Sequence, residues 1–587
     1  MTSPLSFRLD RNREPFVSYS PANQQKEDTM RKSPILLLML FCISMSETYY
    51  VSTSGDNSND GSFQQPWATP GYGSKQMAPG DSLVILSGEY VMETYYDDMI
   101  TPPSGYSGNP TVVTGQGSPL PEMQGTGSLF SCVQLEDYSS NIIVSNMVLT
   151  SLIDEPYTGG TRGGIICSGN SSDILFTGLE RHRTEMMGID LGGDAAGVTI
   201  QDCTIHHTAY TCIGGPSASS QGWVDVLIDQ CYLGYAGHFY NGEDTLSVWD
   251  RPDGVGFEDS EGPVTISNTL VEHTNGDGLD SKAKRTWIHH CTVSNCFADG
   301  IKLWGDSSFV ENTLVYGTGD SVAVSSPWCA LVIGTDDQNA VFGVTNCTFW
   351  DSPQRPSHYL STVQYDNPSV SIDLVLQNNL FCGNRRLYCR PCADVTAQGN
   401  LFRVVDESVQ ITANGQDFDS LSIGNLGTGN VYADPEFLYV PDWGHDGDFH
   451  VGQNSPAVDG GVNSGLDDDL DYFPRPYNSL YDIGCYEWHP TGISVNTEPA
   501  SSHGGNTVRV SPNPALETAT LEAVGPDTFS RAEVYSLDGR LVALLEPAGD
   551  DEAKFIWELE NCRSGVYFAR LSGEGNTVVS GTILVLE

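Results

Sequence analysis

Short stretches in which apolar and polar residues alternate recur along the middle of the chain. Val264-Thr-Ile-Ser-Asn268 and Thr286-Trp-Ile-His-His290 are two examples, and a period of two is typical of a β-strand with one buried face. Each stretch leads to a polar residue that is followed by two variable residues and an apolar one. The instances of this pattern are Asn146-Met-Val-Leu149, Asp202-Cys-Thr-Ile205, Gln230-Cys-Tyr-Leu233, Asn268-Thr-Leu-Val271, His290-Cys-Thr-Val293, Asn312-Thr-Leu-Val315, Asn346-Cys-Thr-Phe349, Asn378-Asn-Leu-Phe381 and Gly399-Asn-Leu-Phe402.

The spacing of these instances predicts the architecture. Two steps of 22 residues lead from Asn268 through His290 to Asn312, and the other steps fit the same unit with loops inserted. Short strands at a coil-length period, with a polar residue at a fixed turn position, predict an all-β right-handed parallel β-helix whose stacked coils bury a continuous core. The residue after the polar position is often a cysteine, and these cysteines are predicted to line the core: Cys203, Cys231, Cys291 and Cys347.

The chain is strongly acidic. Its 587 residues include 27 Lys plus Arg and 75 Asp plus Glu, which gives a formal net charge of -48. Nucleic acids and anionic membranes are bound through basic surfaces, so this balance argues against both as partners. With 17% charged and 39% hydrophobic residues, the chain is predicted to be globular and not a disordered acidic tail.

The first 46 residues have the pattern of a leader and signal peptide. Arg31-Lys32 precede the apolar run Ile35 to Ile43, and Ser44-Met-Ser46 offers small residues for cleavage before Glu47. The run is too short to span a bilayer, and Met30 is the expected start. We therefore expect a secreted or surface-attached protein whose mature chain has no transmembrane span. In an oxidising compartment, a disulfide within the cluster Cys382, Cys389 and Cys392 is favoured over a zinc site.

Recognisable motifs stand at both ends of the repeat region. It opens on Tyr49-Tyr-Val-Ser-Thr-Ser-Gly-Asp-Asn-Ser-Asn-Asp-Gly61, Pro66-Trp-Ala-Thr69 and Pro79-Gly-Asp81. It closes on Asp434-Pro-Glu-Phe437, Asn454-Ser-Pro-Ala-Val-Asp-Gly460 and Asp482-Ile-Gly-Cys-Tyr-Glu487. Over residues 47–490 the chain resembles secreted bacterial β-helix proteins related to polysaccharide lyases, and this resemblance implies the architecture more than the chemistry.

The composition changes after a Ser-, Thr- and Gly-rich linker at residues 491–506. Val508-Arg-Val-Ser-Pro-Asn-Pro514, Val534-Tyr-Ser-Leu-Asp-Gly-Arg-Leu-Val542 and Ser564-Gly-Val-Tyr-Phe-Ala-Arg-Leu571 predict strands, with a hairpin turn at Asp538-Gly539. Residues 507–587 resemble the C-terminal sorting domain of type IX secretion cargo, a small Ig-like β-sandwich. The resemblance implies the secretion machinery as a partner, and a generic adhesion or stalk module is the alternative.

A second repeat lies between the instances of the first. Asp253, Asp277, Asp299 and Asp320 follow one another in steps of 24, 22 and 21 residues, and Gly follows the first three. They are therefore predicted to stack on adjacent strands. If the apolar third residue of each strand points inward, the fourth residue and the sixth point outward. The outward residues are then Gly256, Asp280, Lys302 and Ala323, followed by Glu258, Lys282, Trp304 and Ser325, with Arg285 in the next turn.

Stacked carboxylates need a neutralising partner. At about 5 Å they repel by roughly 3 kcal/mol per pair at an effective dielectric near 20. A calcium ion, which takes several oxygen ligands, is the cofactor that this pattern favours, with Asp277, Asp280 and Asp299 as its ligands. The alternative is that each aspartate only caps the turn before glycine.

The same coils resemble those of calcium-dependent pectate lyases that use a lysine base, through Asp277-Gly-Leu-Asp-Ser-Lys282 followed by Asp299-Gly300. The resemblance implies β-elimination on an acidic polysaccharide, with Lys282 or Lys302 as the base. Because Trp304 and Glu258 share the predicted outward face and Arg285 is in the next turn, we expect these three residues to contact the substrate. A lysine among carboxylates is expected to have a raised pKa, which opposes a base role unless a metal intervenes.

Two other functions stay open. The paired aspartates also resemble those of polygalacturonases, which implies hydrolysis of the same class of polymer. Ala298 stands where an acidic residue is expected in either family, and Lys302 stands where one is expected in the lyases. The missing acid at position 298 favours a non-catalytic adhesion, stalk or glycan-binding protein.

Overall fold

The computed structural model describes residues 46–489 and 507–585, except for 127–128, 153–162, 217–219, 239–251, 319–328, 351–360, 364–369, 406, 441–446, 512–517, 525–528, 537–540, 546, 549–550, 559–564 and 574–577. The predicted leader and the predicted linker therefore lie outside the described residues, apart from Ser46. The helices within the described ranges are α1 (Pro70–Gln76) and the 3-10 turn η1 (Ile423–Asn425), and neither is long and apolar enough to cross a membrane.

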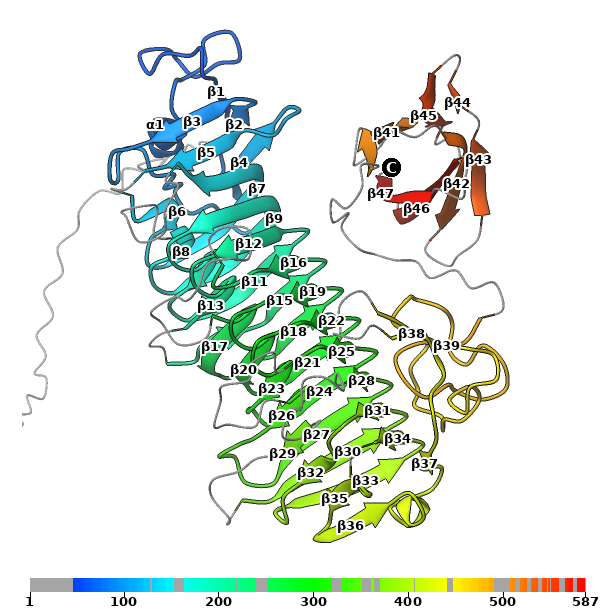
Figure 1. Cartoon of the computed structure of the whole chain (residues 1–587). Coiled ribbons are helices and arrows are strands. Elements are labelled where there is room, and N and C mark those ends of the chain that lie inside the picture. The colour runs from blue at the N-terminus through cyan, green and yellow to red at the C-terminus, as the bar shows by residue number, and fades with distance from the viewer. Residues whose placement is uncertain are drawn as a thin grey trace, which may run out of the picture. The chain divides into compact units, whose positions relative to one another are not determined.

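Three parallel sheets are built from successive turns of the chain, which we call the coil stack (Figure 1). The first sheet contains β1 (Thr48–Val51), β2 (Ser82–Leu86), β4 (Thr111–Gln116), β7 (Ser139–Ser151), β9 (Ser171–Thr184), β11 (Ala195–Gln201), β14 (Trp223–Val224), β15 (Val226–Asp229), β18 (Val264–Ser267), β21 (Thr286–His289), β24 (Ser308–Glu311), β27 (Ala340–Thr345), β30 (Ile372–Gln377) and β33 (Ala393–Gln398).

The second sheet is continuous with the first through the long strands β7 and β9. Its other strands are β3 (Glu89–Met92), β5 (Glu122–Gly125), β12 (Thr204–Thr208), β16 (Tyr232–Gly234), β19 (Leu270–Glu272), β22 (Thr292–Ser294), β25 (Leu314–Tyr316), β28 (Thr348–Trp350), β31 (Leu380–Gly383), β34 (Leu401–Val404) and β37 (Val431–Tyr432).

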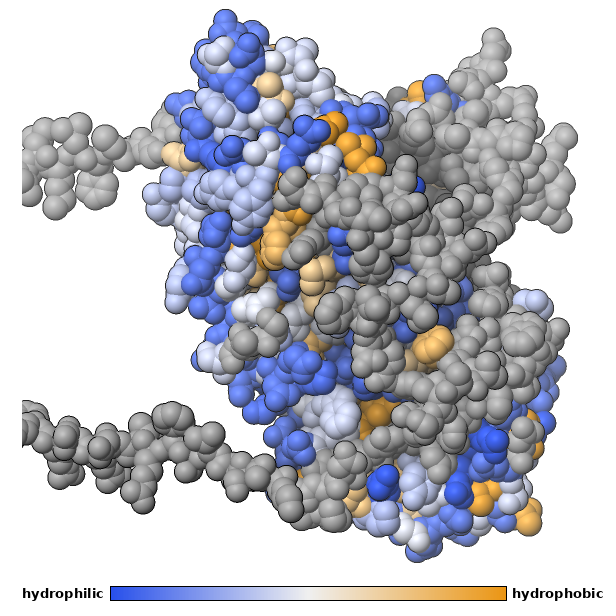
Figure 2. Space-filling model, turned by 60° about the vertical axis from the view of Figure 1, so that its left-hand side comes forward, coloured by the Kyte–Doolittle hydropathy of each residue, from blue (hydrophilic) through white to orange (hydrophobic). Residues whose placement is uncertain are grey.

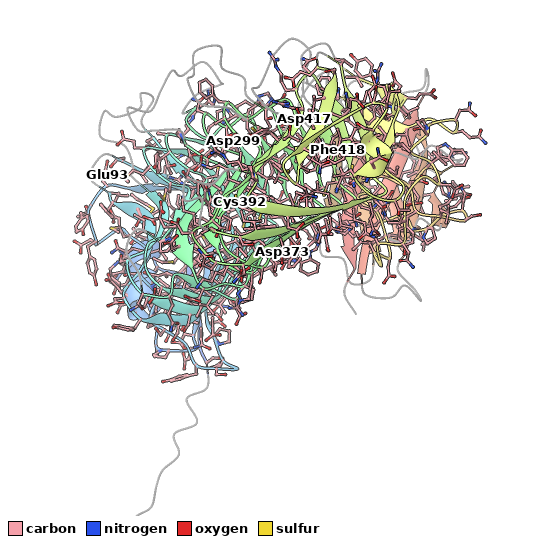
Figure 3. All side chains as sticks on the ribbon, turned by 90° about the horizontal axis from the view of Figure 1, so that it is seen from below. Glu93, Asp299, Asp373, Cys392, Asp417 and Phe418 are labelled. Atoms are coloured by element: carbon pink, nitrogen blue, oxygen red, sulfur yellow. The ribbon has the colours of Figure 1, made fainter. Side chains whose placement is uncertain are left out.

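The third sheet has 12 strands, and only its last pair is antiparallel. Its strands are β6 (Ser131–Leu135), β8 (Gly163–Cys167), β10 (Ile189–Leu191), β13 (Ile213–Gly215), β17 (Val255–Ser260), β20 (Leu279–Ala283), β23 (Ile301–Leu303), β26 (Leu331–Ile333), β29 (Ser361–Val363), β32 (Leu387–Cys389), β35 (Val409–Ala413) and β36 (Gln416–Asp419). Seen from below, Asp299 next to the third sheet and Asp373 on the first sheet lie on different sides of the stack (Figure 3).

Buried apolar side chains from all three sheets fill the space between them, and in several strands they alternate with more exposed residues. In β30, Ile372, Leu374 and Leu376 are buried while the residues between them are more exposed. Equivalent positions on successive coils stack, as the rings of Phe349, Phe381 and Phe402 do at centroid distances of 5.3 Å. Each such side chain contributes roughly 1.5–3 kcal/mol by leaving water. The predicted all-β architecture is confirmed, and Cys203, Cys231, Cys291 and Cys347 line the core as expected.

The recurring polar residue occupies a left-handed corner between the first and second sheets. The backbone φ is 50° at Asn268, 51° at His290, 42° at Asn312, 51° at Asn346 and 54° at Asn378. Asparagine tolerates this conformation better than most residues because its short side chain forms local hydrogen bonds. The recurrence of a polar residue at this position therefore reflects the left-handed backbone that the corner requires.

One predicted stacking is wrong. β23 pairs with β26, so Cys329 stands beside Asp299 and Val332 beside Lys302, in the places predicted for Asp320 and Ala323. The inward row decides this register, because Leu331 and Ile333 continue the apolar positions of β23. Asp320, Ala323 and Ser325 themselves lie outside the described residues.

The segment that follows β37 folds back and packs beside the row of left-handed corners. β38 (Phe437–Tyr439) and β39 (Asp448–Val451) form a small antiparallel pair, and Phe449 packs against Tyr316 and Trp350 of the second sheet. Corner side chains hold this segment by hydrogen bonds, such as Asn346 Nδ2 to the carbonyl of Asp482 at 3.0 Å and Asn312 Nδ2 to that of Asp468 at 2.9 Å.

The C-terminal part contains two four-stranded antiparallel sheets. One has β40 (Thr507–Ser511), β41 (Thr518–Val524), β45 (Asp551–Glu558) and β44 (Pro547–Ala548), and the other has β43 (Leu541–Leu545), β42 (Phe529–Ser536), β46 (Gly565–Gly573) and β47 (Val578–Val585). Buried residues of both sheets, among them Leu521, Phe555, Val534 and Leu571, form one apolar cluster, which makes this part a sandwich.

The described surface is largely polar on the face that Figure 2 shows, with apolar residues in small groups. Among the described residues no two cysteines are joined by a disulfide, so the predicted bridge within Cys382, Cys389 and Cys392 is not formed between these three residues.

Candidate functional site

Three aspartates form a ladder that ties successive coils together. The Oδ1 atom of Asp253 accepts the backbone N–H of Asp277 at 2.7 Å, and Asp277 Oδ1 accepts that of Asp299 at 2.9 Å. Asp299 Oδ1 accepts the N–H of Cys329 at 2.6 Å. One oxygen of each carboxylate therefore caps the next coil, which is the structural role that the Asp-Gly pattern predicts.

The glycine after each aspartate is required by close packing. A Cβ atom on Gly278 would lie 2.3 Å from Val293 Cγ1 and 2.6 Å from the carbonyl of Gly300. Gly254 and Gly300 have the same kind of neighbours. The Asp-Gly repeat thus carries a packing constraint in addition to any chemistry.

Two lysines meet the remaining carboxylate oxygens on the outward face of β17, β20 and β23. Lys302 Nζ lies 2.7 Å from Asp277 Oδ2 and 3.2 Å from Asp280 Oδ2. Lys282 Nζ lies 3.2 Å from Asp280 Oδ2 and 3.5 Å from Glu258 Oε1. The structure therefore brings together five of the eight residues that the sequence singled out.

These lysines are held in their ammonium form. Burial lowers the pKa of Lys302, but the charges of Asp277 and Asp280 outweigh this effect and raise the pKa above its usual value. The pKa of Lys282 is likewise raised, because Asp280 and Glu258 outweigh the desolvation. Neither amine is a ready base in this arrangement.

The outer members of the ladder are shifted toward their neutral form. Burial raises the pKa of Asp253 well above its usual value, and the charges of Asp277 and Asp280 add to the shift. Burial followed by the charge of Asp277 does the same for Asp299. Burial therefore favours the protonated form of these two carboxyl groups.

The carboxylates offer a set of oxygen donors for a divalent cation. One oxygen from each of Asp253, Asp277 and Asp280 lies within 4.8 Å of the others. Asp280 Oδ1 is buried and has no hydrogen-bond partner in the described part of the chain, which leaves one donor atom unused. Hard oxygen donors of this kind suit calcium. The residues fit such an ion, provided that Lys302 releases Asp277 and Asp280.

The compact group of carboxylates contains Asp253 and does not contain Asp299, which the sequence had suggested as a ligand. The signal for Asp253 was present in the sequence, because its step of 24 residues to Asp277 belongs to the same ladder. The Asp-Gly pattern alone did not separate a ligand from a turn cap.

The two remaining candidates are placed differently. Trp304 is half-buried after β23, and its indole Nε1 is buried without a hydrogen-bond partner among the described residues. Arg285 has left-handed backbone, and its guanidinium donates to the carbonyls of Glu261 at 2.8 Å and Gly262 at 2.6 Å. Arg285 therefore fastens a turn in this structure.

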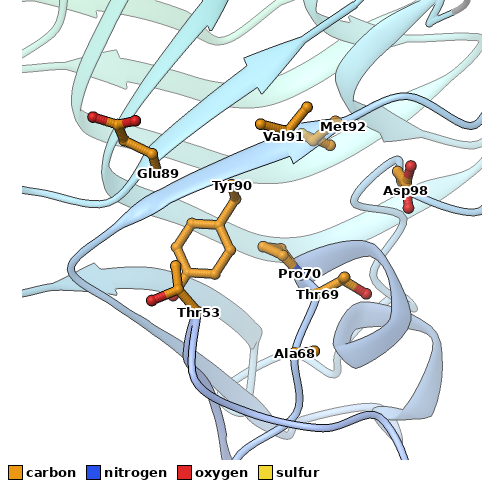
Figure 4. A pocket seen from close by; sticks show the side chains of 9 residues that line it. All are labelled: Thr53, Ala68, Thr69, Pro70, Glu89, Tyr90, Val91, Met92 and Asp98. Carbon is orange, nitrogen blue, oxygen red and sulfur yellow. The ribbon is translucent and has the colours of Figure 1, made fainter.

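Two pockets in the described chain lie at the N-terminal end of the coil stack. One of about 170 Å³ is lined by Thr53, Ala68, Thr69, Pro70, Glu89, Tyr90, Val91, Met92 and Asp98 (Figure 4). The second is lined by residues that include Lys75, Tyr96 and Asp137. Neither contains a residue of the aspartate ladder. The Lys75 ammonium donates to the carbonyls of Gly71, Asp97 and Met99, so it stabilises the N-terminal end of the coil stack.

Comparison with known proteins bears on the fold. The model of a family described as "Right handed beta helix region" matches residues 238–425. The coil stack is a right-handed parallel β-helix. No curated protein sequence matches the chain.

Several solved structures resemble this β-helix. A pectate lyase is 14% identical, with 76% of this chain and 98% of that chain covered and a TM-score of 0.38. A rhamnogalacturonan lyase is 14% identical, with coverage of 70% and 97% and a TM-score of 0.39. The A-module of a mannuronan C-5 epimerase from Azotobacter vinelandii is 12% identical, with coverage of 62% and 90% and a TM-score of 0.40.

Proposed function

We propose that the β-helix is a polysaccharide lyase that acts on acidic glycans with the help of a calcium ion. The observation that carries this proposal is the group of Asp253, Asp277 and Asp280, whose oxygens lie within 4.8 Å of one another, beside the two ammonium groups of Lys282 and Lys302. Carboxylates and amines on one face supply the kinds of group that β-elimination on a uronate requires.

The reaction breaks the C5–H bond of the uronate, forms the C4–C5 double bond and releases the C4-linked oxygen, which takes up a proton. A calcium ion on the aspartates would neutralise the uronate carboxylate and so acidify the C5 proton. In this proposal Lys302 would leave Asp277 and Asp280 when the cation binds. Away from these carboxylates and beside the cation, its ammonium would release a proton to solvent, and the resulting amine would take the C5 proton. The side chain of Lys282, which is 27% exposed, orients the uronate.

The test incubates the protein with polygalacturonate or alginate, once with calcium and once with a chelator. Ultraviolet absorbance measures the unsaturated products. Wild type is expected to form product only with calcium, and Lys302→Met or Asp280→Asn should lower the rate by at least about 100-fold. Lys284→Met is the matched control, because Lys284 pairs with Glu261 at 3.2 Å on the neighbouring turn and should keep full activity.

The results separate three functions. Activity that survives Lys302→Met and Lys282→Met together rules out the lysine mechanism. New reducing ends without absorbance indicate a hydrolase. Binding without any product indicates a non-catalytic glycan-binding protein, which the use of three aspartate oxygens as backbone caps favours as the second candidate.

We also propose that the protein is secreted and that the C-terminal sandwich directs it to a type IX secretion pathway. Expression of the full chain in a bacterium with that pathway should place it outside the cell. A chain that ends at residue 489 should stay in the periplasm if the proposal holds, and export of both forms would contradict it.

A further inference from the structure

A second cluster of metal-ligating side chains lies on the second sheet, in β9 and β12. These strands pair in parallel, with Glu180 beside Thr204, Arg181 beside Ile205 and His182 beside His206. Arg181 and Ile205 point into the core and are buried. Because side chains alternate along a strand, Glu180, His182 and His206 share the outward face.

The two imidazoles are arranged around one carboxylate oxygen. His182 Nε2 and His206 Nε2 each lie 4.0 Å from Glu180 Oε1. The rings are stacked, with centroids 5.4 Å apart and planes 7° from parallel. The side chains are 48% exposed for Glu180, 22% for His182 and 23% for His206, so an ion in solution reaches the three atoms directly.

The other nitrogen of each imidazole is already engaged. His182 Nδ1 lies 3.3 Å from Thr150 Oγ1, and His206 Nδ1 lies 2.6 Å from His207 Nδ1. In protein metal sites the ligating histidine usually has its second nitrogen fixed by such an outer partner, which sets the tautomer and the ring orientation. Here both outer partners leave Nε2 facing the carboxylate.

We propose that Glu180, His182 and His206 bind a divalent transition metal, for which zinc is the reference ion. Two imidazole nitrogens and one carboxylate oxygen match zinc and its neighbours in the first transition series and do not match calcium. Tetrahedral ligands at bonds of about 2.1 Å are about 3.4 Å apart, so each of the two Nε2–Oε1 distances of 4.0 Å closes by about 0.6 Å on binding. The two Nε2 atoms are more than 4.8 Å apart, so the stacked imidazoles also have to rotate toward each other. A water molecule completes the shell.

The experiment measures zinc binding to the full chain by calorimetry and by competition with a chromophoric chelator. Wild type is expected to bind one zinc ion at this site in the presence of millimolar calcium. His182→Ala and His206→Ala should each weaken binding by more than about 100-fold, and Thr150→Val by about 10-fold, because outer-shell partners typically contribute 10–100-fold. The absorption bands of bound cobalt report the ligand geometry independently.

Two controls make the result specific. His289→Ala removes a histidine of a second His-His pair, whose Nδ1 atoms are 2.9 Å apart in the same way, and it should leave zinc binding unchanged. Asp280→Asn removes a donor of the aspartate group and should also leave it unchanged. Equal loss with His289→Ala, or unchanged binding with both His182→Ala and His206→Ala, would overturn the proposal, and circular dichroism confirms that each variant is folded.

Discussion

At the scale of single residues, a bridging histidine beside the second sheet makes stability depend on pH. His450 Nδ1 lies 2.6 Å from Asp448 Oδ1, and its Nε2 lies 2.8 Å from Asp471 Oδ2. Burial lowers the pKa of His450, but these hydrogen bonds and charges outweigh it and raise the pKa to about 9. The unfolded value is about 6.5. The resulting stabilisation is complete below pH 6.5 or so and is lost as the pH rises through about 9.

We therefore expect His450→Gln to destabilise the protein at about pH 6 by about 3 kcal/mol and to have little effect at about pH 10. Urea unfolding of both proteins at each pH gives the difference in free energy. Other groups with raised pKa values, such as Asp469 and Asp482 at about 7, are common to both proteins and cancel. An equal difference at the two pH values would contradict the expectation.

The candidate site shows what single residues reveal without a structure. Strand parity placed Asp280, Lys282 and Lys302 on one outward face, because a period of two leaves little freedom. Parity does not say where a long side chain ends. Arg285 turns to the carbonyls before β18, and Lys302 crosses one coil to Asp277, and both outcomes depend on contacts between coils.

At the scale of elements, the number of residues between repeats predicted correctly which strands pair wherever successive coils had similar lengths. The steps of 24 and 22 residues placed β17, β20 and β23 in register. The next step failed because an insertion separates β25 from β26, and an Asp-Ser pair inside it imitated the repeat. Register follows the inward apolar residues, and a polar motif alone does not identify a coil.

The cost of a left-handed backbone can be tested at another turn, which leads into the first sheet and whose side chain does little else. Asn339 has a φ of 58°, is exposed and directly precedes β27. Asn339→Val should lower the free energy of unfolding by about 1–2 kcal/mol, since a β-branched residue is strained in this conformation. Asn339→Gly should be neutral within about 0.5 kcal/mol. Thermal unfolding of the pair measures the difference, and equal stability would show that this turn relaxes.

At the scale of the whole molecule, the charge of -48 sets a condition on the proposed substrate. The field of an acidic protein repels a polyanion over distances longer than any single contact. Under the proposed function the attraction has to come from a few groups at the site, and Lys282 and Lys302 are already paired with carboxylates at 2.7–3.5 Å. An acidic glycan would therefore approach against the long-range field and would be held by short-range contacts and by the proposed calcium ion.

The dependence of affinity on salt distinguishes the long-range repulsion from the short-range contacts. The Debye length falls from about 30 Å at 0.01 M to about 8 Å at 0.15 M, so added NaCl screens the long-range repulsion while contacts below about 4 Å are screened much less. With calcium held constant, the affinity for polygalacturonate should rise several-fold over this interval, whereas that for a neutral glycan should stay flat. Fluorescence anisotropy of labelled oligosaccharides measures both. Affinity that falls with salt would show that exposed basic groups dominate recognition, and the calcium-centred site would then lose its main physical support.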